Sequence, residues 1–241
     1  MTASLRVLLQ RLIDYAGLYP PAALRLPEVL ANHRRYLESP ESWMLNRLVL
    51  PQTKLAEALL EPHWRVTLLV EDEPGPLPPH VETLEIKSAR RLSLPTYCEA
   101  PVDQIRYVVV VDEHHRRAFA KIRMGETVPA SEDVASFLLS GVPFKATAGL
   151  HHPIRAQMHG FINVFVAAAL AWYGADRAML IDALEERDAR AFEFDDDALH
   201  WRGRALTTAQ IAAARRDFAH SFGLCSFEEP VRDLRALEWL P

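Results

Sequence analysis

Short apolar runs rich in β-branched residues recur from residue 44 onward, and most are separated by gaps long enough for a helix. This pattern predicts a parallel sheet that is covered by helices on both faces. Two of the eight candidate strands, at 191–194 and 224–227, are weak. The six clear runs are 44–50, 65–70, 81–87, 105–111, 118–123 and 142–148.

Eight candidate strands in a chain of 241 residues favour an α/β fold of the (β/α)8-barrel type. The connections around the second to fifth strands are short for full helices, so we expect an irregular barrel. An open doubly wound sheet is the alternative fold. The chain contains neither a Gly-x-Gly-x-x-Gly nor a P-loop motif, and we expect no cofactor.

The first 43 residues have a different pattern. Apolar residues at helical spacing predict an amphipathic helix over residues 3–16, and Pro27 suits the first position of a second helix, over 27–38. Between these helices, Pro20 and Pro21 force an extended turn. We therefore expect residues 1–43 to form a helical extension or lid that packs on a barrel-like domain of residues 44–241, within one structural domain overall.

Composition narrows the classes of partner. A formal net charge of -5 and a sequence pI near 6.1 argue against nucleic-acid binding, for which a basic patch is the usual footprint. No window approaches the roughly 20 apolar residues of a membrane span. Cys98 and Cys225 form no CxxC pair, and the N-terminus lacks the apolar core of a signal peptide. We expect a cytoplasmic protein, with homo-oligomer formation left open.

Alternation within three of the predicted strands gathers polar side chains on one face of each strand, because successive side chains of a strand point to opposite faces. The other face of each strand carries apolar or small residues and should meet the helices. The charged faces would then line the barrel interior near the carboxyl ends of the strands, where barrel active sites lie. The residues on these faces are Glu85 and Lys87, Lys121 and Arg123, and Lys145 and Thr147.

Cations this close together predict a site for an anion. They either enclose an anion or repel one another, which lowers a lysine pKa and frees its neutral amine. Lys145 is therefore a candidate Schiff-base nucleophile or acid/base group. Lys121 and Arg123 are candidates to clamp a carboxylate or phosphate, with Thr147 and Lys87 as further substrate contacts. We expect an enzyme of the lyase or aldolase type acting on a small anionic metabolite.

Histidines after the sixth run supply further candidates. His151 and His152, together with Glu85, are predicted to carry protons. His159 and Gly160 precede a predicted helix whose first amides can hold an anion. We expect no metal, since the spacing of these histidines matches no known zinc motif.

Three alternatives to this assignment remain open. A metal-dependent hydrolase or lyase would use His151, His152 and His159 as ligands. A protein without catalytic activity would use the cationic mouth to bind an anionic ligand. Finally, lysine and glutamate side chains inside a barrel can form ion pairs that only fill space.

Several segments carry a resemblance to known proteins. They are Lys121-x-Arg123, residues 144–153, residues 158–161 and residues 14–21. In these segments, which cover the middle third of the chain and the proline turn, the chain resembles members of an uncharacterised bacterial protein family with no known activity. The strand with Lys145 and Thr147 is also loosely similar to the lysine strand of barrel-fold Schiff-base aldolases. That second resemblance implies an active-site lysine.

Overall fold

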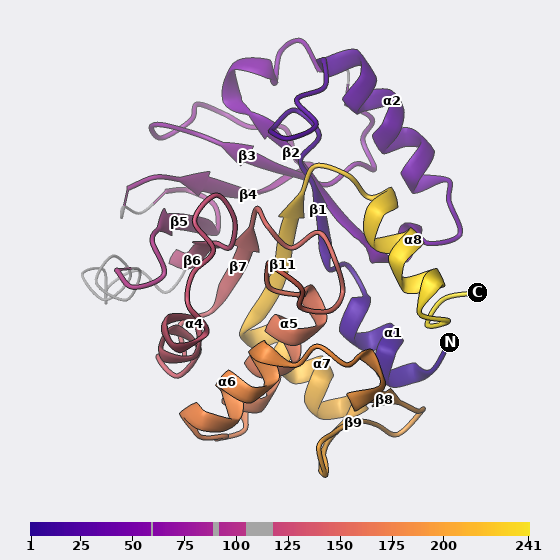
Figure 1. The fold of residues 1–241 in the computed structure, drawn as a ribbon. Helices are drawn as coiled ribbons and strands as arrows, with labels where there is room; N and C mark the ends of the chain where they lie inside the picture. Colours follow the sequence, from indigo (N-terminus) through magenta and orange to yellow (C-terminus); the bar gives the residue numbers. More distant parts are fainter. Residues whose placement is uncertain (59, 89–91, 105–117) are drawn as a thin grey trace.

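Eight parallel strands close into a barrel in the computed structural model, which describes all residues except 59, 89–91 and 105–117 (Figure 1). Around the barrel the order is β1-β11-β7-β6-β5-β4-β3-β2. The expected (β/α)8-barrel-like fold is confirmed, and the closed order excludes an open doubly wound sheet. The strands are β1 (Ile13–Tyr15), β2 (Leu45–Pro51), β3 (Val66–Leu69), β4 (Val81–Ile86), β5 (Thr96–Ala100), β6 (Ala118–Arg123), β7 (Phe144–Thr147) and β11 (Ala219–Leu224).

The helices surround this barrel, and a small antiparallel sheet of order β10-β9-β8 lies beside it (Figure 1). In the described part of the chain, no helix is long and apolar enough to span a bilayer. The helices are α1 (Ala3–Leu9), α2 (Leu26–Leu37), α4 (Ser131–Leu138), α5 (Phe161–Trp172), α6 (Arg177–Glu185), α7 (Thr208–Asp217) and α8 (Glu228–Ala236). The small sheet consists of β8 (Phe192–Phe194), β9 (Ala198–Trp201) and β10 (Arg204–Thr207), and single 3-10 turns lie at Ser42–Met44, Gln52–Lys54 and Ala189–Ala191.

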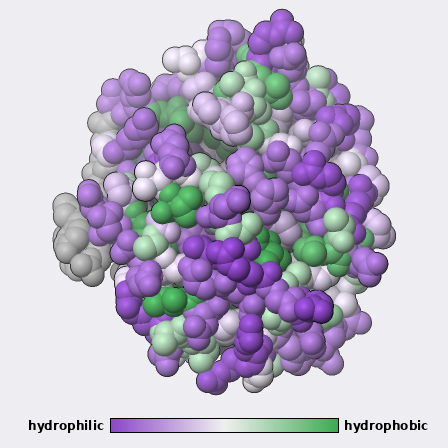
Figure 2. Space-filling model, viewed as in Figure 1, coloured by the Kyte–Doolittle hydropathy of each residue, from purple (hydrophilic) through white to green (hydrophobic). Residues whose placement is uncertain are grey.

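The distribution of apolar side chains explains which helices are buried. Helix α5 is apolar on all sides apart from the hydrogen-bonded Asn163, and its residues 161–170 are buried between the barrel and α6. Helix α2 buries only one stripe, which includes Val29 and Tyr36. On the face drawn in Figure 2, hydrophobic residues form only small groups on a mainly hydrophilic surface.

The strands of the barrel differ in part from those expected. The runs at 44–50, 65–70, 81–87, 118–123 and 142–148 form β2, β3, β4, β6 and β7, whereas the run at 105–111 lies outside the described residues. The weak run at 191–194 forms β8, which belongs to the small sheet and not to the barrel. The last barrel strand, β11, ends at Leu224, where the run at 224–227 was expected to begin. Strand β5 was missed because Thr96–Ala100 does not alternate between apolar and polar residues and contains a single β-branched residue.

The N-terminal segment contributes a strand as well as helices. Helix α1 ends at Leu9, and Arg11 then adopts a left-handed backbone conformation with φ 47° that a helix cannot continue through. Residues 13–15 form β1, which pairs with β2 and β11 in parallel. The helix expected over 3–16 is thus too long, because the apolar residues that suit its stripe also suit a buried strand. The barrel therefore begins before residue 44, within the expected extension.

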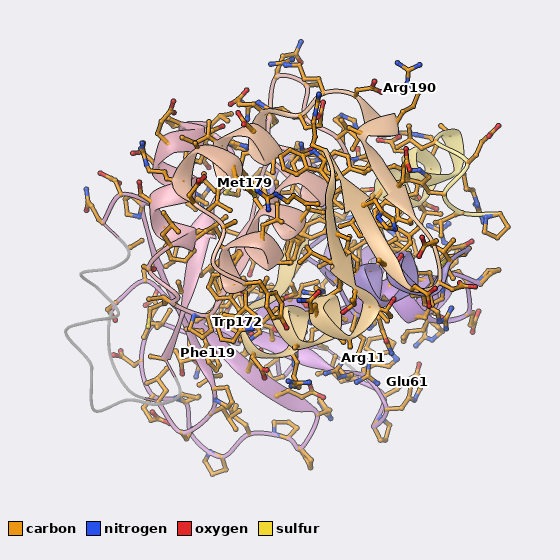
Figure 3. The ribbon with its side chains drawn as sticks, turned by 90° about the horizontal axis from the view of Figure 1, so that it is seen from below. Arg11, Glu61, Phe119, Trp172, Met179 and Arg190 are labelled. Carbon is orange, nitrogen blue, oxygen red and sulfur yellow. The ribbon has the colours of Figure 1, made fainter. Side chains whose placement is uncertain are left out.

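Aromatic and imidazole side chains fill the barrel interior at the amino-terminal ends of the strands. Phe119 near the start of β6 packs on Tyr97 of β5 and His220 of β11, with ring centroids 5.3 and 4.9 Å away. The Tyr97 hydroxyl and His220 Nδ1 are hydrogen-bonded at 2.9 Å. The view from below in Figure 3 looks toward this end of the barrel, where Phe119 and Trp172 lie. A ligand must therefore enter from the other end.

Helix α2 buries a histidine with no hydrogen-bond partner. His33 is 1% exposed and lies between Tyr15 and Trp64, with ring centroids 6.3 and 4.8 Å away. Neither of its ring nitrogens has a hydrogen-bond partner among the described residues. Burial, helped by the nearby His63, lowers the pKa of His33 to about 4. His33 is therefore neutral near pH 7.

Replacing His33→Phe should make the free energy of unfolding depend less steeply on pH in the acidic range. The pKa of His33 in the folded protein lies below its unfolded value of about 6.5. The contribution of neutral His33 to the free energy of unfolding is therefore complete above pH 6.5 and is lost as pH falls towards 4. Across that interval we expect the native chain to lose on the order of 2–3 kcal/mol more unfolding free energy than the variant does. Urea titrations at several pH values measure this difference. His152→Gln, at an exposed site away from His33, is the control, and parallel curves for the native chain and His33→Phe would contradict the prediction.

Candidate active site

A chain of alternating charges crosses the barrel interior. Lys145 Nζ donates to Asp14 Oδ2 and to Glu85 Oε1, at 2.5 Å each. Lys121 Nζ lies 2.6 Å from the second oxygen of Glu85 and 2.7 Å from Glu99 Oε2. These contacts join β1, β7, β4, β6 and β5, so the charges cross-link strands that lie far apart in the sequence.

Strand register sets the two lysines level with each other. Lys121 of β6 is the register partner of Lys145 of β7, and Glu99 of β5 is the partner of Lys121. All three side chains point inward, as alternation along β6 and β7 predicts for the lysines. Glu85 reaches both lysines from β4 across the interior.

The pairing reverses the pKa change expected for Lys145. Burial alone would lower the pKa of Lys145, but Asp14 and Glu85 raise it above its ordinary value. Burial would likewise raise the pKa of Glu85, but Lys121 and Lys145 lower it to about 2. The expected repulsion between lysines is absent because a carboxylate lies between them. Lys145 is therefore an ammonium at neutral pH, and the expectation of a neutral amine at this position is wrong.

The network continues in both directions from these residues. Towards the mouth, Arg123 pairs with Glu99 at 3.2 Å and with Glu126 at 2.7 Å. Towards the closed end, Asp14 accepts hydrogen bonds from Asn46 at 2.7 Å and from Ser221 at 2.8 Å. Every carboxylate of the interior thus has cationic or polar partners, which buried charges require.

A cavity of about 450 Å³ lies at the carboxyl ends of the strands. Lys145 does not line it and is only 1% exposed, below the cavity wall. Tyr19, which was not predicted as a site residue, lines the cavity from the loop after β1. The predicted site residues that line it are Glu85, Lys87, Lys121, Arg123, Thr147 and His151.

Several hydrogen-bond donors in this cavity are unused by the protein among the described residues. Both oxygens of Glu85 and both of Glu99 already accept from lysine or arginine. Lys121 uses two of the three hydrogens of its ammonium, and Lys87 forms no ion pair with any described residue. The buried Tyr19 hydroxyl has no hydrogen-bond partner in the described part of the chain. The cavity therefore suits a ligand rich in acceptor oxygens.

His151 is the histidine that faces the cavity. Its Nδ1 lies 2.9 Å from the Glu229 carboxylate of α8, so Nδ1 carries the hydrogen of that bond. The other ring nitrogen, Nε2, is then left to accept a proton. A carboxylate that orients an imidazole in this way is a common arrangement for a proton carrier.

The other two histidines of the predicted cluster face elsewhere. His152 is 57% exposed and lies 2.6 Å from Asp233 of α8, so the expectation that it carries protons in the cavity is not supported by its position. His159 is buried, bonds to the carbonyl of Pro129 at 2.9 Å and lies outside the cavity wall, and burial lowers its pKa. No group of three His, Cys, Asp or Glu side chains in the described part of the chain is arranged to hold a metal ion. The three histidines do not converge on one point, so the described residues do not support the alternative of a three-histidine metal site.

The start of α5 is not an open anion site. The amides of Phe161 and Ile162 donate to the carbonyls of His152 and Pro153, at 3.0 and 2.9 Å. A side chain at Gly160 would meet the Pro153 carbonyl at 2.4 Å, so this glycine permits a close approach of the preceding loop. The expected anion site at Gly160 is not supported, because the loop already occupies the next two amides of the helix start.

The strand ends around the cavity are held by close backbone packing. Ala148, directly after β7, and Glu126, after β6, have left-handed backbones with φ 57° and 65°. A side chain on Gly149 would lie 2.3 Å from the Met124 carbonyl. Such backbone conformations are unfavourable for residues other than glycine and cluster at functional sites.

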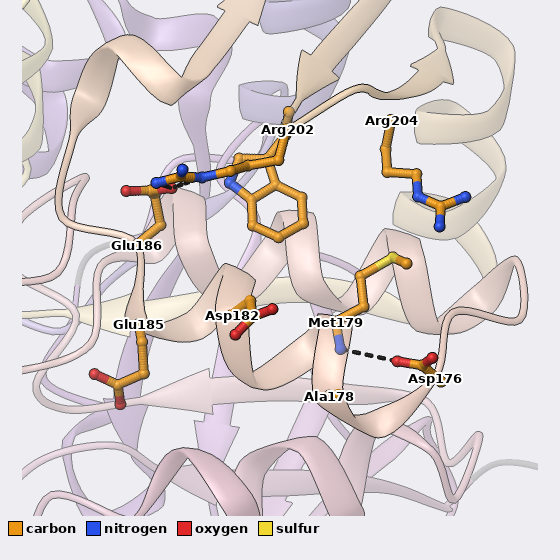
Figure 4. A pocket seen from close by; sticks show the side chains of 9 residues that line it. Asp176, Ala178, Met179, Asp182, Glu185, Glu186, Arg202 and Arg204 are labelled. Carbon is orange, nitrogen blue, oxygen red and sulfur yellow. Dashed lines mark hydrogen bonds and ion pairs between the residues drawn. The ribbon is translucent and has the colours of Figure 1, made fainter.

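A separate hollow of about 670 Å³ lies between α6 and the small sheet (Figure 4). Arg202 pairs there with Glu186, and Asp176 accepts from the Met179 amide. None of the predicted site residues lines this hollow.

The sequence reasoning missed three residues of the site. Asp14 was assigned to a helix, Glu99 lies on the strand that was not predicted, and Tyr19 was considered only as part of a lid. The available signal was weak for each of them. The clearest signal is Asp14, which lies within the apolar segment before Gly17. An unpaired carboxylate is costly to bury, so an acid in such a segment indicates a buried partner.

No family model, no curated protein and no solved structure matches the chain.

Replacing Lys145→Met should destabilise the fold strongly. The change leaves Asp14 and Glu85 without the ammonium they share, and removing one partner of a buried ion pair costs about 3–5 kcal/mol. Lys54→Met, which removes an exposed pair with Glu57, should change unfolding free energy by less than about 1 kcal/mol. Urea denaturation measures both variants, and equally small losses would show that the buried ammonium is dispensable.

Proposed function

We propose that the chain is an enzyme that acts on a small anionic metabolite at the barrel mouth, in a lyase or aldolase-type reaction. The observation that carries the proposal is the presence of unused donors in the cavity beside a histidine–carboxylate pair. The carboxyl ends of barrel strands are where active sites of this fold lie. A cytoplasmic location is part of the same proposal, supported by the low cysteine content.

Lys121 is the lysine that would meet the substrate. It lines the cavity, and Glu85 and Glu99 hold its ammonium in a fixed position. Its remaining N–H can bind the oxygen on which negative charge develops when a bond next to a carbonyl breaks. A donor fixed before the reaction stabilises such charge without having to reorganise.

His151 would move the proton. In an aldol cleavage its Nε2 takes the proton of the substrate hydroxyl, and the carbon–carbon bond breaks. The electron pair of that bond forms an enolate whose oxygen binds Lys121. The proton on His151 then passes to the enolate carbon, so the step needs no oxidant or reductant.

Lys145 has a positioning role in this proposal. Its ammonium fixes Glu85, which in turn holds Lys121. A protein that only binds a ligand would use the same donors but would have no need of a proton carrier oriented by Glu229. The His151–Glu229 pair is thus the feature that favours catalysis over binding.

The adjacent histidines offer a matched test of this mechanism. The full-length protein is incubated in D2O with a panel of hydroxy acids, keto acids and sugar phosphates, and NMR follows cleavage and hydrogen exchange. His151→Gln should reduce the rate by about 10²–10⁴-fold, the usual contribution of acid–base catalysis. His152→Gln, outside the cavity, should retain the native rate. Equal rates in the two variants, or no reaction with the whole panel, would count against the proposal.

Borohydride trapping tests the role of Lys145 separately. A buried ammonium between two carboxylates cannot attack a carbonyl, so treatment with keto acids and borohydride should leave Lys145 unmodified in mass mapping. A substrate-dependent adduct on Lys145 would show that it loses its proton during the reaction and would return it to the role of nucleophile.

A further inference from the structure

The order of strands divides the cavity wall into two continuous halves. One half comes from β4, β5, β6 and β7, which are neighbours in the barrel. The other half comes from β3, β2, β1 and β11, which are also neighbours. The first half presents Glu85, Lys87, Glu99, Lys121, Arg123 and Thr147, and the second half presents Leu69, Val49, Ala16, Leu224 and Cys225. The strands and strand ends that line the cavity are therefore polar on one side and apolar on the other, and the loops after β1 and β7 add Tyr19, His151 and Met158 to the wall.

The apolar half limits what can fill the cavity. A sugar phosphate carries hydroxyl groups along its length, and hydroxyls pressed against Val49, Leu69 and Leu224 would lose water without gaining a hydrogen bond. A hydrocarbon or aromatic group in the same place would gain free energy from burial. The body of the ligand should therefore be apolar.

The charge on the polar half favours a carboxylate over a phosphate. Three basic side chains of the wall, Lys87, Lys121 and Arg123, are balanced by three acidic ones, Glu85, Glu99 and Glu126. A site without excess positive charge suits a singly charged group better than a dianion. The unused donors of Lys121 and Tyr19 can still bind two oxygens.

We propose that the substrate is an amphipathic carboxylic acid, whose carboxylate or keto-acid head binds the polar half and whose aromatic or branched aliphatic body lies against the apolar half. The choice of an acid as substrate rests on the proposed function, but binding can be measured without turnover. Tyr19 contributes to both parts, since its ring lines the cavity and its hydroxyl is an unused donor.

Calorimetric titration of the full-length protein tests this assignment. The probes are pyruvate, 4-methyl-2-oxopentanoate, phenylpyruvate, ribose 5-phosphate and inorganic phosphate. Each buried methylene should raise affinity about fourfold, so phenylpyruvate should bind at least about tenfold more tightly than pyruvate. Ribose 5-phosphate and phosphate should bind more weakly than either larger acid. Equal binding of pyruvate and phenylpyruvate, or tightest binding of ribose 5-phosphate, would overturn the assignment.

Two variants separate the halves of the cavity. Leu69→Gln should abolish the preference for phenylpyruvate over pyruvate while leaving the affinity for pyruvate unchanged. Lys87→Met should weaken both acids by the same factor and preserve their ratio. Leu139→Gln, at an exposed site directly after α4, is the control and should change neither. If Leu69→Gln does not fold, Val49→Thr makes a similar change with little change in volume, and a preference that survives at a polar wall would contradict the proposal.

The result also distinguishes this inference from the proposed function. A preference for phenylpyruvate without turnover of any acid would contradict the proposed reaction and support the proposed ligand class. Turnover of a sugar phosphate that depends on His151, with no binding of the larger acids, would support the proposed reaction and contradict the proposed ligand class.

Discussion

The ammonium of Lys145 between Asp14 and Glu85 is the interaction on which the barrel interior depends. It joins β7 to β1 and β4, two strands that are not its neighbours in the sheet. Backbone ladders close the barrel strand by strand, whereas this ion pair acts across its interior. Charges buried this deeply are tolerated only when they are paired, so a register slip in any of the three strands would leave one of them unpaired.

Local periodicity predicted the inward faces and placed Glu85 among them, but it did not predict the other two acidic partners of the lysines, Asp14 and Glu99. Lys121 and Lys145 could be placed by counting alternate residues along two recognisable strands. Asp14, however, lies 131 positions from Lys145 in a segment whose apolar spacing also suits a helix. Glu99 belongs to a strand without alternation between apolar and polar residues. Without these acids, neighbouring lysines predict repulsion, which is why the expected pKa change had the wrong sign.

Turn geometry explains why the histidines were harder to assign. His151 and His152 are adjacent and equally suited to proton transfer, yet one faces the cavity and the other faces α8 near the surface. Their directions are set by the loop between β7 and α5, whose carbonyls bind the first amides of the helix. A loop that satisfies a helix terminus in this way leaves no amide for an anion, and its path is not encoded in residue spacing.

The two halves of the cavity wall also come from different parts of the amino-acid sequence. The polar half comes from strands in the middle of the chain. The apolar half comes from β1, β2 and β3 near the N-terminus and from β11 near the C-terminus, and β1 and β11 are neighbours in the barrel. Substitutions in β2 and β3 can reshape the apolar half while Glu85, Glu99 and Lys121 stay in place. The two terminal segments are more constrained, because Asp14 of β1 holds Lys145 and Glu229 of α8 orients His151.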